Sequence, residues 1–336
     1  MLDYSHLEKY DPSGMHKVYD MWPQIAKESY ESKHNTVDFG TVNHIVFAGM
    51  GGSGAVGDIL AAILSKTKIH VDVVKGYLLP KTINANSLVI TTSISGNTPE
   101  TLNVLDSSKQ LTRKIIAFSS GGKMEKYCSE KNIEYRKIPL YHSPRASFTG
   151  FLYSILKILS PMLPIKNESV YESLGMMENL SKEINSSDLS EKNPAIELAK
   201  SITKIPLIYY PWGLQAAAIR FKNSLAENAK NHAIIEDVIE ACHNGIVSWE
   251  KPSSIQPILL QGDQDYFKTK ERWKILKLFF DENNIQYQEI FSTKGHILSK
   301  LIHLIYFLDY VSIYHAILSK IDPTPVKSLD FIKTKV

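Results

Sequence analysis

Cysteine is scarce in this sequence of 336 residues, and neither sign of charge is in excess. The two cysteines, Cys128 and Cys242, are too few for a disulfide framework or a cysteine-rich zinc module. The chain has 38 Lys and Arg residues against 35 Asp and Glu residues, a formal net charge of +3. A charge so close to zero argues against a protein built to bind nucleic acid.

Long uninterrupted apolar runs are also lacking. The beginning of the chain, MLDYSHLEKYDPSGMHK, does not resemble the apolar core of a signal peptide. The most apolar stretch, residues 297–318, is broken by Lys300, His303, Asp309 and His315. We expect it to form an amphipathic helix in a protein core and not a membrane span. These absences predict a soluble, cytoplasmic protein that binds neither a membrane nor nucleic acid.

The sequence contains no familiar motif for a metal ion or for ATP. It has no HExxH, no CxxC, and no closely spaced pair of histidines beside a carboxylate. It also has no GxxxxGK[ST] loop, so nothing supports ATP hydrolysis. We therefore predict a protein without a metal and without another cofactor.

What the sequence does have is the composition of a globular chain, 43% hydrophobic and 22% charged, which excludes a disordered or fibrous protein. Its length exceeds that of one compact domain, so we expect two domains. Between residues 167 and 198, Ser, Asn, Glu and Lys dominate. This segment predicts one or two polar helices that join the domains.

Short apolar runs that alternate with helical patterns predict an α/β fold with mostly parallel sheets covered on both faces. The predicted strands are residues 45–48, 71–74, 87–92, 114–118, 133–138, 205–210, 255–260 and 286–290. The predicted helices are residues 55–64, 99–111, 148–159, 215–230 and 272–280. Because the elements follow a similar order in both halves, we expect two related domains.

A glycine-rich turn, GMGGSG, follows the first predicted strand and precedes a helix. Its glycines would let the backbone approach an anion at the start of that helix. Gly49, Gly51 and Gly54 fit the GxGxxG spacing of dinucleotide-binding proteins, but that motif needs an acidic residue about 20 positions later. Asp72 meets this requirement only loosely because it lies inside a predicted strand. A tight turn with no ligand is the alternative.

A second loop, TTSISGNTPE, gives a sharper signal. Ser93, Ser95 and Thr98 offer three hydroxyls where the free N–H groups of the following helix point. Hydroxyls and helix-end amides together bind a phosphate monoester without a metal. A simple helix cap by Thr98, before Pro99, is the alternative. We favour phosphate binding, since a cap does not need three hydroxyls within six residues.

Three more side chains have suitable chemistry. Arg145, in SPRAS at a predicted helix start, would give a phosphate a fixed fork of donors. Taken alone, it is more simply a surface arginine or part of an interdomain ion pair. Glu227 and His243, sixteen positions apart, are a carboxylate and an imidazole that could move protons. Their spacing alone does not distinguish them from ordinary solvated side chains.

These motifs resemble a known family. GMGGSG followed by TTSISGNTPETL is similar to the sugar isomerase (SIS) domain, whose Ser-x-Ser-x-Asn-Thr loop holds a sugar phosphate. The segments PRASFTGFLYSIL, LAENAK, HNGIVSWE, DYVSIYHAIL and IDPTPVKSLDFIK extend the match to the C-terminus. Together they resemble the bifunctional phosphoglucose/phosphomannose isomerase family. The resemblance implies an α/β chain of two SIS-type doubly wound domains, each a mostly parallel sheet flanked by helices.

On this basis we place four segments along the chain. A first SIS domain with an N-terminal extension would occupy residues 1–165, and a helical linker residues 166–190. A second SIS domain would occupy residues 191–320. A C-terminal tail, residues 321–336, would reach the active site.

The resemblance also implies an aldose–ketose isomerase that interconverts glucose 6-phosphate, and also mannose 6-phosphate, with fructose 6-phosphate through an enediolate. Glu227 would move the proton between C1 and C2. His243, reaching in from the partner subunit of a homodimer, would assist ring opening. The family's C-terminal lysine fits Lys333 best, with Lys327 and Lys335 close by. The residues implied to hold the phosphate are Gly52, Ser53, Ser93, Ser95, Thr98 and Arg145.

One position departs from the family, because Gly245 stands where we expect an acidic residue after His-Asn. Two alternative functions stay open: an isomerase of another sugar phosphate, such as an amino sugar or arabinose 5-phosphate, and a non-catalytic SIS sensor. Such sensors generally carry a DNA-binding helix-turn-helix, for which the residues before Ile45 are too few and not basic. The presence of Glu227, His243 and Lys333 together favours an enzyme.

Overall fold

The structure is a computed structural model that describes residues 2–335. It consists of two compact units. The first unit is Met21–Leu174, and the second unit combines the N-terminal twenty residues with the chain from Gly175 onward. The boundary falls inside helix α8 (Asn167–Ile184), which lies within the segment that we expected to link the domains.

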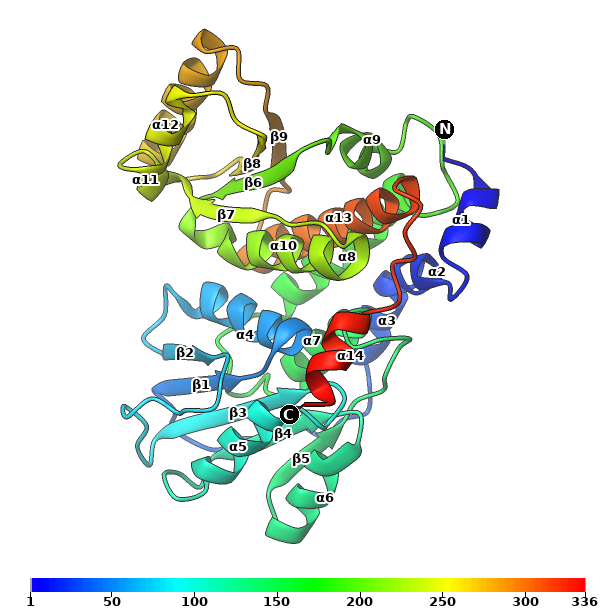
Figure 1. Cartoon of the computed structure of the whole chain (residues 1–336). Coiled ribbons are helices and arrows are strands. Elements are labelled where there is room, and N and C mark those ends of the chain that lie inside the picture. The colour runs from blue at the N-terminus through cyan, green and yellow to red at the C-terminus, as the bar shows by residue number, and fades with distance from the viewer. Residues whose placement is uncertain (1, 336) are drawn as a thin grey trace. The chain divides into compact units, whose positions relative to one another are not determined.

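The first unit contains a five-stranded parallel sheet, with strand order β2-β1-β3-β4-β5 (Figure 1). Its strands are β1 (His44–Ala48), β2 (His70–Val74), β3 (Ser87–Ser93), β4 (Ile115–Ser119) and β5 (Glu134–Lys137). Every residue of the three central strands β1, β3 and β4 is buried. This burial explains the apolar run that each of these strands contains, from which the sequence predicts them well.

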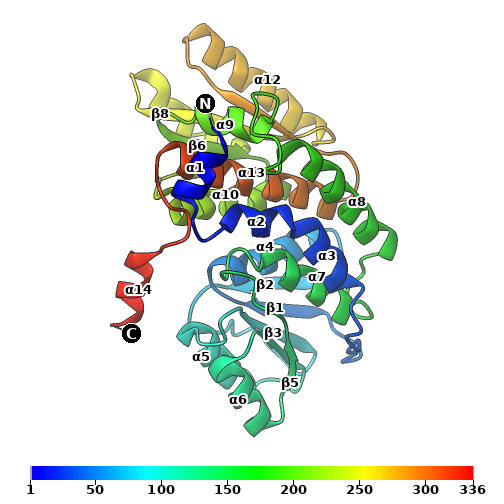
Figure 2. The ribbon, with the colours of Figure 1, turned by 90° about the vertical axis from the view of Figure 1, so that its right-hand side faces the viewer.

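Helices cover both faces of this sheet, as the doubly wound prediction requires (Figure 1, Figure 2). One face carries α3 (Trp22–Tyr30), α4 (Gly51–Leu64) and α7 (Phe148–Ile158), and the other carries α5 (Pro99–Ser108) and α6 (Gly122–Lys131). The strand order reverses between β1 and β3. After β1 the chain continues to β2 at one edge of the sheet, and after β3 it continues to β4 and β5 toward the other edge. In such sheets, ligands bind beyond the carboxyl ends of the strands at this switch point.

The second unit repeats the plan with a four-stranded parallel sheet of order β7-β6-β8-β9. Its strands are β6 (Ile205–Tyr210), β7 (Ile234–Asp237), β8 (Ile255–Gly262) and β9 (Gln288–Ser292). This order matches the first four strands of the first unit, β2-β1-β3-β4, so the predicted relation between the halves is confirmed at the level of topology.

Helices also cover both faces of the second sheet (Figure 1). They are α10 (Gln215–Ala229) and α13 (Ile297–Leu318) on one face, with α11 (Val238–Ala241) and α12 (Phe267–Glu282) on the other. The remaining helical segments of the second unit are α1 (Tyr4–Tyr10), α2 (Met15–Asp20), α9 (Pro194–Ser201), η1 (Trp212–Leu214), η2 (Gly245–Glu250) and α14 (Lys327–Lys333).

One predicted domain boundary differs from the structure. We expected the N-terminal segment to extend the first domain, but its helices α1 and α2 pack on α13 of the second unit. The Tyr306 hydroxyl donates to the Tyr19 carbonyl oxygen at 2.9 Å, and the Tyr310 hydroxyl donates to the Asp20 carboxylate. These buried tyrosines need acceptors, and α2 supplies them.

Helix α13 lies in the core, as we predicted. The prediction that it is amphipathic is wrong. It is long and apolar enough to cross a membrane, yet 83% of its most apolar window is buried inside the protein. The polar residue at its centre is buried too: Asp309 accepts from Arg220 at 2.7 Å and from the Ser224 hydroxyl at 2.5 Å. The central interruption in the apolar pattern therefore marks internal hydrogen bonds and not a solvent-facing stripe.

Acid should destabilise the protein through His303, another polar residue of α13. Its Nδ1 atom is buried without a hydrogen-bond partner among residues 2–335, and burial lowers the pKa of the imidazole to about 4. Between pH 6.5 and pH 4 the unfolded chain therefore takes up a proton that the folded chain refuses. The free energy of unfolding should fall by about 3 kcal/mol over this window as the pH falls.

Chemical denaturation of wild type and His303→Leu across this window measures the effect. The substitution should flatten the pH dependence. His232→Leu, at an exposed histidine, should leave the slope of the wild type unchanged. Parallel profiles for wild type and His303→Leu would contradict the assignment.

Candidate active site

The two motif loops lie beyond the carboxyl ends of neighbouring strands in the first unit. GMGGSG begins directly after β1, and the Ser/Thr loop begins at the last residue of β3. These strands pair in parallel, with Ala48 opposite Thr91. The switch point of the sheet therefore brings together two loops that the sequence separates by about forty residues.

Close packing makes glycine necessary in the first loop. A Cβ atom at Gly54 would lie 2.7 Å from the Gly49 carbonyl oxygen, and one at Gly49 would lie 2.9 Å from the Thr92 carbonyl oxygen. Helix α4 begins at Gly51, which has a positive φ of 52°. No side chain caps this helix start at Met50. The amides of the first turn of α4 thus follow the strand directly, an arrangement that suits an anion.

Ser53 joins the two loops. Its hydroxyl oxygen accepts a hydrogen bond from the Ile94 backbone N–H at 3.2 Å. Ser53 is only 6% exposed, so the bond is sheltered from water. This bond therefore fixes the spacing between the two loops.

The three hydroxyls of the second loop have different environments. Ser93 is buried, and its Oγ lies 2.9 Å from Thr98 Oγ1. Ser95 is exposed, and its Oγ accepts the Asn97 N–H at 3.3 Å. The side chain of Thr98 makes no capping bond to α5, so the simple-cap alternative is wrong. The Thr98 hydroxyl instead bonds to the Ser93 hydroxyl and so links the two ends of the loop.

The second loop also packs against the start of helix α6. A Cβ atom at Gly96, where φ is 70°, would lie 1.7 Å from the Gly121 carbonyl oxygen. The Asn97 side-chain oxygen accepts the Lys123 N–H at 3.0 Å, and the Gly96 carbonyl accepts the Met124 N–H at 2.9 Å. Helix α6, which the sequence analysis missed, therefore supports the loop.

Arg145 lies in a third loop, just before α7. It is only 5% exposed, which rules out the surface-arginine alternative. The loop is held by the Ser147 hydroxyl, which lies within hydrogen-bond distance of two backbone carbonyls, and by Trp22, whose indole N–H donates to the Ala146 carbonyl at 2.8 Å. The helix that follows packs on α4, so this loop belongs to the same face of the first unit.

Glu227 lies near the end of α10 in the second unit and is half-buried. Helix α10 ends at Ala229, and the residue that follows it, Lys230, has a positive φ of 56°. The Lys230 ammonium donates to the Glu227 carbonyl at 2.8 Å and to the Asp322 carbonyl at 3.1 Å. It therefore ties the helix end that carries Glu227 to the segment leading into α14. Lys230 was not among the predicted site residues, although it is the last residue of the LAENAK motif.

His243 follows α11 and is exposed. The structure explains the glycine that comes two residues later. A Cβ atom at Gly245 would lie 2.2 Å from Glu236 Oε1. Burial, with a smaller effect of nearby Glu240, raises the pKa of the Glu236 carboxyl group. The carboxylate of Glu236, in β7, thus occupies the space that a side chain at position 245 would need.

The three C-terminal lysines differ in position. Lys327 begins α14, Lys333 ends it, and Lys335 lies beyond it. All three side chains are exposed. The structure therefore gathers the predicted phosphate-binding loops within the first unit, and distributes Glu227, His243 and Lys333 over separate elements of the second unit.

Comparison with known proteins matches both halves of the chain. A model of the SIS domain matches residues 40–131, and a model described as the bacterial phospho-glucose isomerase C-terminal SIS domain matches residues 191–336. A protein of Caldicellulosiruptor bescii named bifunctional phosphoglucose/phosphomannose isomerase is 33% identical, over 95% of this chain and 97% of its own.

Two further proteins show the range of this similarity. A Sulfolobus acidocaldarius protein named D-glucosamine-6-phosphate 4-epimerase is 29% identical over 74% of this chain and 78% of its own. Among solved structures, a glucose-6-phosphate isomerase like protein from Thermus thermophilus superposes with a TM-score of 0.63. It is 15% identical, and the match covers 100% of both chains. This last likeness concerns the fold alone.

Removing the Ser53 hydroxyl should loosen the paired loops. In Ser53→Ala the buried Ile94 N–H loses its acceptor, which should lower the free energy of unfolding by about 1–3 kcal/mol. Substrate affinity should fall more than turnover, because the loops would no longer be preorganised. Denaturant titration and steady-state kinetics measure the two effects.

Ser65→Ala is the matched control for this change. Ser65 follows the other end of α4, and its exposed hydroxyl donates to the Ala62 carbonyl at 2.8 Å. This variant should behave like wild type in both measurements. An equal loss in the two variants would show that the Ser53–Ile94 bond has no special role.

Proposed function

Because the chain belongs to the bifunctional phosphoglucose/phosphomannose isomerase family, we propose that it interconverts glucose 6-phosphate and mannose 6-phosphate with fructose 6-phosphate. The observation that best supports this proposal is the pair of loops beyond β1 and β3, joined through Ser53 and Ile94. Hydroxyls and helix-start amides at that place suit a phosphate monoester. The first unit would therefore hold the end of the sugar that does not react.

Six residues would hold the phosphate. The first helix turn of α4 and the hydroxyls of the second loop would donate hydrogen bonds, and the guanidinium of Arg145 would supply charge. Binding the phosphate gives remote binding energy that fixes the position of the sugar carbons. The six residues are Gly52, Ser53, Ser93, Ser95, Thr98 and Arg145.

Glu227 would be the base. Moving a carbonyl between C1 and C2 requires removing a proton from one carbon and returning it to the other. A single carboxylate over both carbons does this through an enediolate. His243 would donate and accept protons as the sugar ring opens. The ammonium group of Lys333 would stabilise the negative charge that develops on the enediolate oxygens.

Mannose 6-phosphate differs from glucose 6-phosphate only in its configuration at C2. Accepting both sugars requires the enediolate to present either face of C2 to the same base. Rotation about the bond between C2 and C3 would achieve this while the phosphate stays bound. The proposal therefore assigns both substrates to one base and one phosphate site.

A second candidate function comes from the epimerase relative. Its similarity over 74% of this chain favours, as the alternative, a reaction on a hexosamine 6-phosphate. Such a reaction would use the same phosphate loops, since both substrate classes carry the phosphate at the same end. The two functions differ in the carbon whose proton moves and in the need for an amino group.

Purified protein in EDTA should convert fructose 6-phosphate into glucose 6-phosphate and mannose 6-phosphate, as followed by coupled assays. Glu227→Gln should lower kcat by about 10²–10⁴-fold, because the amide does not accept the carbon-bound proton. Its affinity for fructose 6-phosphate, measured by calorimetry, should stay near that of wild type. The variant thus separates catalysis from binding.

Glu282→Gln, at the exposed end of α12, is the matched control and should keep full turnover. Near-normal turnover by Glu227→Gln would overturn the assignment of the base. Turnover of glucosamine 6-phosphate without turnover of fructose 6-phosphate would favour the epimerase alternative. Binding of fructose 6-phosphate and glucosamine 6-phosphate without turnover of either would favour a non-catalytic sugar-phosphate sensor.

The proposal includes a cytoplasmic homodimer. Its support is the exposure of His243, since an exposed imidazole needs a covering surface before it works in a site shielded from water. A partner subunit would provide that cover, and each active site would combine Glu227 of one chain with the partner subunit's His243. Cytoplasmic sugar phosphates would be the substrates.

Mixed dimers test this arrangement. Neither Glu227→Gln nor His243→Ala should be fully active alone. If the two residues of a site come from different chains, a mixed dimer of the two variants has one intact site. Refolding equal amounts together should then restore up to about a quarter of the wild-type activity. No restoration would mean that both residues act within one chain.

A further inference from the structure

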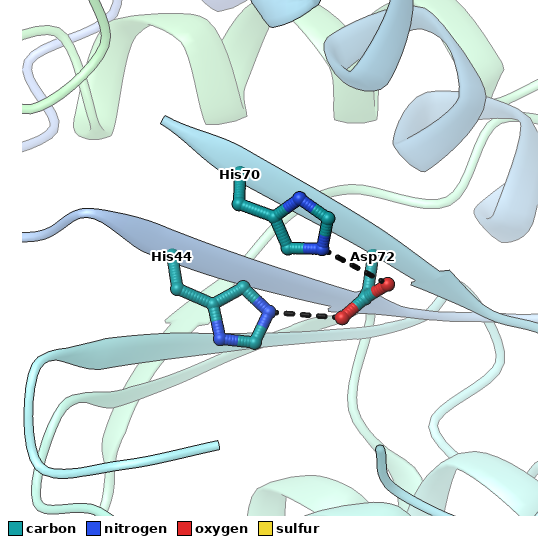
Figure 3. A group of neighbouring side chains, drawn as sticks. All are labelled: His44, His70 and Asp72. Carbon is teal, nitrogen blue, oxygen red and sulfur yellow. Dashed lines mark hydrogen bonds and ion pairs between the residues drawn. The ribbon is translucent and has the colours of Figure 1, made fainter. Parts of the chain in front are cut away.

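A cluster of two histidines and an aspartate lies at the opposite end of the first sheet from the phosphate loops (Figure 3). His44 is the first residue of β1 and His70 is the first residue of β2, and the parallel register places them side by side. Asp72, two residues after His70, points to the same face of β2. Parallel strand pairing therefore brings His44 next to two residues that lie more than twenty positions later in the sequence.

The three side chains are close enough to share one ion. His44 Nε2 lies 2.9 Å from Asp72 Oδ2, and His70 Nε2 lies 3.5 Å from Asp72 Oδ1. One ligand atom from each residue lies within 4.8 Å of the other two. Each carboxylate oxygen faces a different imidazole (Figure 3).

His44 is oriented by its own partners. Its side chain is only 7% exposed, and its Nδ1 lies 2.9 Å from the Ser87 hydroxyl. The Ser87 oxygen is fixed in turn by the Asn84 N–H at 3.0 Å. Without an ion, Nε2–H donates to the Asp72 carboxylate and Nδ1 accepts from Ser87. When an ion displaces the proton of Nε2, Nδ1–H donates to Ser87 and the Nε2 lone pair binds the ion. Metal-binding histidines are commonly held in this way by a hydrogen bond at the second ring nitrogen.

We propose that His44, His70 and Asp72 bind a divalent transition-metal ion of the zinc type. Two imidazoles and a carboxylate are suitable ligands for Zn²⁺ and Co²⁺. Tetrahedral coordination needs ligand atoms about 3.4 Å apart. The two histidines now contact different oxygens of Asp72, at 2.9 Å and 3.5 Å, so the carboxylate has to turn when one of its oxygens binds the ion. The His70 side chain is 66% exposed, so water completes the coordination.

The role of this ion is structural. Strand β2 is the edge of the sheet, and the ion ties its first residues to β1. The phosphate loops start at the other end of β1, a strand length of about 16 Å away. The metal site therefore adds stability to the first unit and takes no part in the proposed isomerisation, so the two proposals fail independently.

The full-length protein, stripped with a chelator, is titrated with Zn²⁺ and with Co²⁺. Wild type should bind one ion per chain in calorimetry, Co²⁺ should give the visible absorption of a four-coordinate site, and Zn²⁺ should raise the melting temperature. His70→Ala should bind at least about tenfold more weakly and lose the shift in melting temperature. Asp72→Asn, which keeps the shape of the side chain, should do the same.

His6→Ala is the matched control. His6 lies 2.7 Å from Asp3, a similar pair that no second histidine joins within residues 2–335. It should bind like wild type. Equal binding by wild type and His70→Ala would overturn the proposal, and so would the absence of binding at one ion per chain. The three residues would then be only a hydrogen-bonded cluster. Isomerase activity in chelator should be the same for His70→Ala and wild type.

Discussion

The parallel pairing of β1 with β3 is the constraint on which the first unit depends. Its register sets Ala48 beside Thr91, so the chain leaves both strands at the same level of the sheet. The two loops that follow have little freedom: glycines pack one loop against the other strand, and Ser53 bonds to Ile94. The hydroxyls and helix-start amides are therefore positioned by the sheet before any ligand arrives.

A buried ion pair has a similar role in the second unit. Arg220 of α10 lies 2.7 Å from Asp309 of α13, and both side chains are almost completely buried. Removing one partner of such a pair leaves an uncompensated charge and costs about 3–5 kcal/mol. The pair fixes the orientation of α10, and Glu227 lies about two turns further along the same helix. The position of the proposed base thus depends on an interaction away from the substrate.

Most of the fold could be predicted from the sequence because buried parallel strands are continuous apolar runs. The edge strand β7 was missed, since its four residues are only partly buried and are strand only because they pair with β6. The site loops were predicted from their residue types, but the Ser53–Ile94 bond was not. The cluster of His44, His70 and Asp72 escaped notice for the same reason: only strand register brings its members together.

The topological match between the units raises the question of why only the first would bind the phosphate. By strand order, the loop after β8 corresponds to the Ser/Thr loop after β3. In the second unit Asp265 lies in that loop, and its carboxylate accepts the Gly262 N–H at 2.9 Å and the Trp273 indole N–H at 3.2 Å.

An internal carboxylate therefore takes backbone and side-chain donors at the place where the first unit has hydroxyls. Burial raises the pKa of Asp265, but the bonds from Gly262 and Trp273 favour its ionised form. A negative charge in this loop would repel a phosphate, and the loop after β6 begins with Pro211 and Trp212 in place of glycines. The repeated plan thus separates two tasks. On the proposed function, the first unit would keep the anion site, and the second unit would supply the groups that move protons.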